Sequence, residues 1–369
     1  MAAVMITTIA DAAVPIRAAA MDDADGTDRE EIKNDIEDDE FEIKSDIENN
    51  DNNIDLDTDD SQNKAVALDT LTYEQLTYTV DNNQVTITGC DKSATSIVIP
   101  PQIDGMDVVA IGNEAFSGCR LLKELVIPDG VKSLGYCIIK DTAISSITIP
   151  KTVTSSEEYD GVGALGDCTT LKEVKFEDEM TVIPSYICAN KIWRNYSIEK
   201  VYIPSTVISI GLSAFKGCRY CINIEIPKGV VSIGDYAFYG CDGLTNIEIP
   251  EGVISIGDYA FYGCDGLTNV EIPESVTNIG DYAFYSCDGL ENVEIPKSIN
   301  VIGNGIFSCC SRLKSIEIPE SVTIIGNHVF EQCYSLTNIE IPKSVTSMGD
   351  YVFDHCSSLI NIKIPEGVT

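Results

Sequence analysis

The sequence predicts an α/β solenoid, a right-handed superhelix of short units that together form one parallel β-sheet on a concave face. An Ile-Pro dipeptide returns every 23 residues from Pro204 to Pro365, and columns of Phe, Cys, Gly and Ile keep the same step. Residues 228–250 and 251–273 differ at only three of 23 positions, which is typical of duplicated units. Within a unit, apolar residues alternate with polar ones just before the Pro, as in a strand with one buried face.

Residues 1–20 are interpreted as a signal peptide truncated at its start. The segment is small and apolar, and its three final alanines resemble an A-x-A cleavage site. The positively charged start is missing, and Asp11 and Arg17 interrupt the apolar run. An ordinary disordered terminus is the alternative; we favour export.

Residues 21–66 are expected to form a disordered acidic linker. Residues 21–64 contain 19 acidic and 4 basic side chains, a net charge of 4 − 19 = −15. The apolar residues of this stretch are too sparse to bury a core. Residues 67–369 then form the solenoid, with residues 67–99 as its N-terminal cap and no C-terminal cap visible in the sequence.

The cap is expected to be a β-hairpin. Apolar and polar residues alternate on both sides of an Asp-Asn-Asn turn in residues 76–89. Asn tolerates the positive φ angles that two-residue hairpin turns require. Such a hairpin would cover the open N-terminal edge of the stack, as capping units do.

About twelve strands are expected in the sheet. Eight end at the regularly spaced Ile-Pro pairs, three at Pro100, Pro128 and Pro150, and one at Phe176. In the unit that begins at residue 267, alternation directs Leu267, Val270 and Ile272 inward. Ala283 and Phe284 of the next segment are expected in a short helical turn on the convex side, which supplies the α part of the fold.

The repeated pattern LxxIxIPxxVxxIGxxAFxxC resembles the BspA-like leucine-rich repeats, the Treponema-type subclass with a 23-residue unit. The resemblance covers residues 71–369, and seven consecutive units reproduce it. It implies a secreted or cell-surface protein of bacteria or parasitic protists, associated with adhesion and protein–protein contact. Insertions between Pro128 and Pro204, and Thr142 in place of a Cys, depart from the pattern.

The cysteine column is interpreted as a row of buried free thiols. Each of its members would lie about 5 Å from two equivalent neighbours, so geometry specifies no unique disulfide pair. Disulfides are the alternative, because an exported chain with an even number of cysteines often pairs them. Cys218 and Cys221 have CxxC spacing, but no second CxxC accompanies them. No metal site and no cofactor are therefore expected.

Two polar columns on the solvent side of the strands are the candidate binding residues. Carboxylates lie two residues before six consecutive Pro residues, with Lys363 next in the column. Amides lie four residues before these Pro residues, with Ser315 as the one exception. Two interpretations stay open: a solubilising face copied by duplication, or an acidic concave strip that binds a basic partner. The candidate residues are Asn223, Glu225, Asn246, Glu248, Asn269, Glu271, Asn292, Glu294, Glu317, Asn338 and Glu340.

Trp193 is a candidate loop contact. It is the only Trp of the chain and lies in the insertion 189–197. Exposed aromatic residues on irregular loops are frequent contact points. Folding of the Trp193 ring back over Ile192 and Tyr196 is the alternative.

The composition and the absence of known motifs exclude several classes of function. With 24 basic and 59 acidic residues the formal net charge is −35, which opposes binding to nucleic acid or anionic lipid. Neither a run of 18 apolar residues nor a catalytic motif is found, and the two His occupy non-equivalent places. We expect a non-catalytic secreted or cell-surface module that binds a protein or peptide, of basic character, through the concave sheet face. The alternative is a structural spacer or scaffold segment of a larger surface or glycan-degrading assembly.

Overall fold

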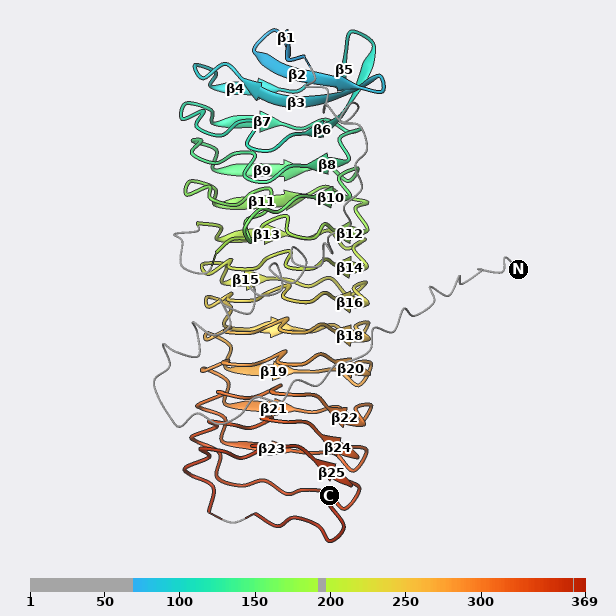
Figure 1. Cartoon of the computed structure of the whole chain (residues 1–369), viewed down its shortest axis with the longest axis vertical. Helices are drawn as coiled ribbons and strands as arrows, with labels where there is room; N and C mark the ends of the chain where they lie inside the picture. Colours follow the sequence, from blue (N-terminus) through green and yellow to red (C-terminus); the bar gives the residue numbers. More distant parts are fainter. Residues whose placement is uncertain (1–68, 192–196, 361) are drawn as a thin grey trace, which may run out of the picture. The chain divides into compact units, whose positions relative to one another are not determined.

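The computed structural model describes residues 69–191, 197–360 and 362–369. Residues 66–369 form one compact unit, in which the chain winds into a stack of similar turns (Figure 1). The predicted signal peptide and acidic linker lie outside the described residues. Most turns contribute one short strand to each of two columns, and a run of tight turns joins the second strand to the next unit.

The first column consists of the strands that precede each Pro. Its strands pair in parallel with their neighbours in the runs β4–β7, β9–β11–β13–β15 and β17–β19–β21–β23. Ten of the twelve predicted positions carry a strand in the described residues, and Asn338 at the eleventh forms a single bridge with Ser315. The bounds are β4 Ser96–Val98, β7 Glu124–Val126, β9 Ser146–Ile149, β11 Glu173–Phe176, β13 Lys200–Tyr202, β15 Asn223–Ile224, β17 Ile247–Glu248, β19 Asn269–Glu271, β21 Asn292–Glu294 and β23 Ser315–Glu317.

The second column consists of the strands that follow each Pro. They pair in parallel in the runs β6–β8–β10, β12–β14–β16–β18–β20 and β22–β24–β25. The bounds are β6 Met106–Ile111, β8 Ser133–Leu134, β10 Ser155–Ser156, β12 Val182–Ile183, β14 Ser209–Ile210, β16 Ser232–Ile233, β18 Ser255–Ile256, β20 Asn278–Ile279, β22 Val301–Ile302, β24 Ile324–Ile325 and β25 Ser347–Met348.

The predicted hairpin is present at the N-terminal end. Strands β2 (Leu76–Asp81) and β3 (Gln84–Cys90) pair antiparallel, and the turn residues Asn82 and Asn83 have φ angles of 48° and 62°. These left-handed values are those of a tight hairpin turn. Strand β1 (Leu71–Tyr73) adds to β2, while β3 pairs in parallel with β6. The short strand β5 (Gln102–Ile103) also pairs with β6. The cap is thus continuous with the second column.

The predicted helical turns are wrong: no helix occurs in the described residues, so the fold is a β-solenoid rather than an α/β solenoid. In the segment after each second strand, backbone N–H groups donate to the next unit. Tyr259 bonds Asp281 O at 3.0 Å, Phe261 bonds Ala283 O at 2.8 Å, and Gly263 bonds Tyr285 O at 2.9 Å. Tyr259 and Gly263 also have φ angles of 54° and 63°, which an α-helix does not accommodate. Bonds between units therefore replace those within a helix.

The core is a set of stacked columns between the two strand columns and the turns. Phe238, Phe261 and Phe284 are fully buried and stack with ring centroids 5.2 Å apart. Leu267 and Ile256 belong to further fully buried columns. A single unit could not enclose these side chains, so each unit depends on its neighbours for burial.

Candidate binding face

The solvent side of the first column, here called the strand face, carries a straight row of carboxylates. Glu248 pairs with Glu271, Glu271 with Glu294, and Glu294 with Glu317 in the parallel register of β17, β19, β21 and β23. Parallel strands lie about 4.8 Å apart, so these carboxylates recur at that interval. Glu225 and Glu340 are exposed at the equivalent places before Pro227 and Pro342. We call these six glutamates the acidic strip.

The sequence determines this row because the strands alternate. In β19 the central Val270 is buried, whereas Asn269 and Glu271 on either side are exposed. The same alternation holds in β21 and β23. Since the unit length is constant, the polar positions of successive strands come into register without a bulge.

The acidic strip has no ion-pair partner among the described residues. No ion pair of this part of the chain involves Glu248, Glu271, Glu294 or Glu317. The nearby pair between Lys314 and Glu291 lies at the beginning of the strands, outside the strip. Like charges in adjacent strands repel one another, so a cation of a partner would be attracted to this row.

The amide column lies beside the acidic strip. Asn292 Nδ2 donates to Asn269 Oδ1 at 3.4 Å, whereas Asn269 and Asn338 donate to the hydroxyl of the preceding Thr. Asn246 is exposed just before β17, and Asn223 begins β15, but the Asn223 side chain is outside the described part. One amide bond between units is therefore found in this column, and most of the amide groups remain available to solvent.

The N-terminal end of the strand face has a different chemistry, which the sequence reasoning missed. The places equivalent to the strip glutamates are occupied by Val98, Val126, Thr148, Lys175 and Tyr202. Val98 is 66% exposed, Val126 42% and Tyr202 49%. Lys175 Nζ lies 5.4 Å from the centre of the Tyr202 ring, within cation–π range. The sequence holds a signal for this change: upstream of Glu225, the residues two places before each Pro are no longer glutamates.

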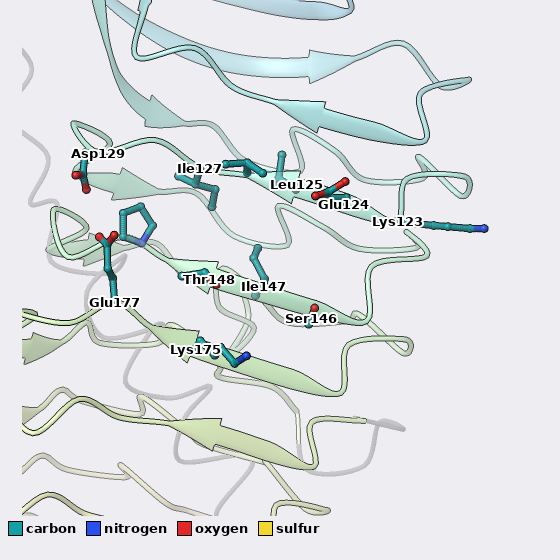
Figure 2. Close-up of a pocket in the computed structure, with 12 residues that line it drawn as sticks. Lys123, Glu124, Leu125, Ile127, Asp129, Ser146, Ile147, Thr148, Lys175 and Glu177 are labelled. Atoms are coloured by element: carbon teal, nitrogen blue, oxygen red, sulfur yellow. The ribbon is translucent and has the colours of Figure 1, made fainter.

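A pocket of about 450 Å³ lies on this part of the face. Figure 2 shows its lining on β7, β9 and β11, with Glu124, Ser146, Thr148 and Lys175 on successive strands. Ile127, Ile147 and Pro150 add apolar surface, while Lys123, Asp129 and Glu177 add charges of both signs. The strand face therefore changes from a mixed apolar and aromatic end to a row of six glutamates, after which Lys363 occupies the equivalent place.

The turns on the opposite side of the second column carry polar and aromatic ladders that serve the fold. Asp258 Oδ1 accepts the backbone N–H of Asp281 at 2.8 Å, and Asp281 Oδ1 accepts that of Asn304 at 2.8 Å. Tyr259 stacks on Tyr236 and Tyr282 with centroids 4.9 and 5.0 Å apart. These contacts use the carboxylates and much of the ring surface within the chain.

The cysteines are free, and eleven of the fourteen are buried. From Cys241 to Cys356, each sulfur of the column donates to the carbonyl of the Phe 26 residues earlier, for example Cys264 to Phe238 O at 3.2 Å and Cys287 to Phe261 O at 3.1 Å. Burial raises the pKa of the Cys264 thiol well above its ordinary value. These thiols act as small core residues, as the sequence analysis expected.

Trp193 lies outside the described residues. Among the residues that the structure describes, no group of three or more His, Cys, Asp or Glu side chains could hold a metal ion. The same residues include no helix of the length and apolar character needed to cross a membrane.

A family model identifies the repeat class. A model of the BspA type leucine rich repeat region, which contains six copies, matches residues 88–192, 188–310 and 277–369. Solved structures also match. A leucine-rich cell surface protein of Faecalibacterium prausnitzii is 24% identical over 80% of this chain and 94% of its own, with a TM-score of 0.45. A leucine-rich repeat protein of Bacteroides ovatus is 26% identical over 81% and 89%, with a TM-score of 0.48.

The pneumococcal vaccine antigen PcpA is 14% identical over 82% of this chain and 89% of its own, with a TM-score of 0.46. The search of curated proteins found no match. The family model covers residues 88–369, well over half of the 369 residues, and its repeat coincides with the turns described above. The chain belongs to the BspA-type leucine-rich-repeat family.

Proposed function

We propose that this protein is a non-catalytic binding module, secreted or held at the cell surface, that engages a basic segment of a protein or peptide along its strand face. The observation that carries the proposal is the acidic strip: Glu248, Glu271, Glu294 and Glu317 lie in register, exposed and without an ion pair among the described residues. A row of uncompensated carboxylates costs stability, so its repetition in consecutive units has a physical reason if a partner neutralises it.

The spacing of the strip suits an extended segment. Six carboxylates about 4.8 Å apart span roughly 24 Å, the reach of about seven residues of extended chain. Every second side chain of such a segment faces the same side, so three or four Lys or Arg residues would face the glutamates. The mixed end of the face, with Val126 and Tyr202 exposed, favours a partner whose basic stretch adjoins an apolar one.

Two further observations support the proposal, the first its location and the second its binding role. Residues 1–20 have the apolar run and the alanine triplet of a secretory signal. The BspA-type repeat, whose family model matches residues 88–369, is the kind of extended surface that proteins use to bind other proteins.

The test compares two triple variants of equal charge. The strip variant loses three charges of the acidic strip through Glu248→Gln, Glu271→Gln and Glu294→Gln. The control variant loses three exposed charges of the turns after the Pro residues through Glu251→Gln, Glu320→Gln and Glu366→Gln. The probe is a fluorescent eight-residue peptide with alternating Lys, measured by anisotropy at two salt concentrations. We expect the strip variant to bind about tenfold more weakly and the control variant about as tightly as the natural protein.

Equal effects of the two triple variants would overturn the proposal, because net charge alone would then attract the peptide. Affinity that ignores salt would also count against the strip, since exposed ion pairs are screened within about 8–10 Å at physiological salt. A spacer role predicts no ligand on the strand face, so the same measurement separates the two functions.

A further inference from the structure

Two cysteine sulfurs meet where the cap joins the first repeat. Cys90 is the last residue of β3, and Cys119 lies in the turns of the first unit. Their Sγ atoms are 3.1 Å apart, and both thiols are free. Cys119 is fully buried, whereas Cys90 is partly exposed.

This contact arises because the cap replaces a repeat. From Cys241 onward each sulfur of the column donates to the Phe carbonyl 26 residues earlier, as Cys264 does to Phe238 O. The residue 26 places before Cys119 is Ser93 of the cap, so Cys119 has no equivalent Phe carbonyl. Its sulfur lies against the sulfur of Cys90 instead.

A positive charge lies beside the pair. Lys92 Nζ is 3.7 Å from Cys119 Sγ and donates a hydrogen bond to Ser117 O. Burial of the Cys90 thiol raises its pKa and outweighs the charge of this ammonium group, which lowers that pKa. The cluster thus combines an accessible thiol, a second thiol in contact with it and a neighbouring cation.

We propose that Cys90 and Cys119 form a thiol-oxidation site, which a low-molecular-weight disulfide such as oxidised glutathione converts into an intrachain disulfide. The Cys90 thiolate attacks one sulfur of the oxidant, which gives a mixed disulfide and releases one glutathione thiolate. The Cys119 thiolate then attacks Cys90 Sγ and releases the second. Overall two protein thiols lose two electrons and two protons, and one glutathione disulfide becomes two thiols.

The bond would tie the cap to the repeat that it covers. Strand β3 is paired with β2 on one side and with β6 on the other, so it connects the outer strands of the cap to the repeats. The ends of a solenoid have neighbours on one side only and are the places where opening begins. A crosslink from β3 to the first unit reduces the freedom of the opened cap.

The reaction should be slow at neutral pH. Burial, followed by the hydrogen bond with Cys119, raises the pKa of the Cys90 thiol to about 12. Below that pKa the thiolate fraction rises tenfold per pH unit, so the oxidation rate should rise about tenfold per unit between about pH 7 and 9.

The experiment incubates the full chain with oxidised glutathione, alkylates the remaining thiols and maps the peptides without reduction. We expect a crosslinked peptide that contains Cys90 and Cys119 and is two hydrogens lighter than the sum of its thiol forms. Hydrogen exchange in β2 and β3 should slow at least about tenfold on oxidation. The Cys90→Ser variant should show neither change, and Cys309→Ser, which removes another partly exposed thiol, should behave like the natural protein.

Three outcomes would overturn the proposal: both thiols alkylated after long oxidation, a stable glutathione adduct on Cys90, or a bond from Cys90 to another cysteine. The mapping needs no variant, so a misfolded Cys90→Ser protein would leave the test intact. The result is independent of the strand face, since neither sulfur belongs to it.

Discussion

The carboxylate of Asp258 accepts a hydrogen bond from the backbone N–H of Asp281, one unit further along the chain, at 2.8 Å. Asp258 in turn donates its own N–H to Asp235 Oδ1 at 2.9 Å. The two bonds link three successive units through the same position of the repeat. This ladder, rather than a helix, holds the turns in register.

Removal of the Asp258 carboxylate should weaken the stack. Asp258→Ala leaves the Asp281 N–H to water, and we expect a loss of about 0.5–1.5 kcal/mol in the free energy of unfolding. Asp258→Asn should cost less, because Asn already serves this role elsewhere in the column: Asn304 Oδ1 accepts the N–H of Asn327, and Asn327 Oδ1 accepts that of Asp350. Urea denaturation followed by circular dichroism measures both; equal losses would contradict the role of the side-chain oxygen.

The stability contributed by Asp258 should depend on pH. Desolvation by the neighbouring turns raises the pKa of this carboxyl from 3.8, the Asp281 N–H lowers it, and the charges of Asp235 and Asp281 raise it again. At pH values between the pKa of Asp258 in the unfolded state and its raised pKa in the folded state, the folded state binds more protons than the unfolded state. The free energy of unfolding of the natural protein should therefore rise relative to that of Asp258→Asn as pH falls from about 6 to 4. A difference that is constant over this range would contradict the shift.

The glycine before the ladder cannot carry a side chain. A Cβ at Gly280 would lie 2.3 Å from Asp258 Oδ1 and 2.4 Å from its backbone N. Gly280→Ala must displace the ladder, and we expect a loss of about 3 kcal/mol or more. The control is Gly263→Ser, where Ser286 in the next unit adopts nearly the same φ, 55° against 63°. This control should cost about 1 kcal/mol or less, measured by the same denaturation.

Neutralising one member of the acidic strip should stabilise the protein. Glu271 lies between Glu248 and Glu294 in register, so Glu271→Gln removes two repulsive contacts. We expect a gain of a few tenths of a kcal/mol at low salt, which high salt abolishes. Glu251→Gln, at an exposed turn position, should change stability less at both salt concentrations. A loss of stability in Glu271→Gln would show that this carboxylate is already paired.

The parts of the fold that repeat with the period of the sequence could be predicted from it. The buried Val270 between the exposed Asn269 and Glu271 was predictable, because alternation in a strand is local. The registered glutamates were predictable as well, since equal unit lengths bring equivalent residues together. The hairpin turn at Asn82 and Asn83 followed from the preference of Asn for positive φ.

The helical turn predicted at Ala283 and Phe284 was wrong for a reason that no local pattern reveals. Phe284 donates its N–H to Ile306 O at 3.0 Å, in the next unit. Residue preferences for helix are weak, and partners 22 residues away outweigh them once the units stack. Pairing between units also fixes Tyr282 at a φ of 58°, which removes the helix as an option.

By itself the sequence determined the period, the strand positions, the buried columns and the row of glutamates. Each of these features recurs at a fixed step along the chain and is formed by equivalent residues of adjacent units. The tertiary structure decided what lies where the repetition stops. The contact of Cys90 with Cys119 joins non-equivalent residues at the cap, and the pocket on β7, β9 and β11 forms at the irregular units. Such contacts depend on the path of the backbone in three dimensions, and spacing along the chain does not contain that path.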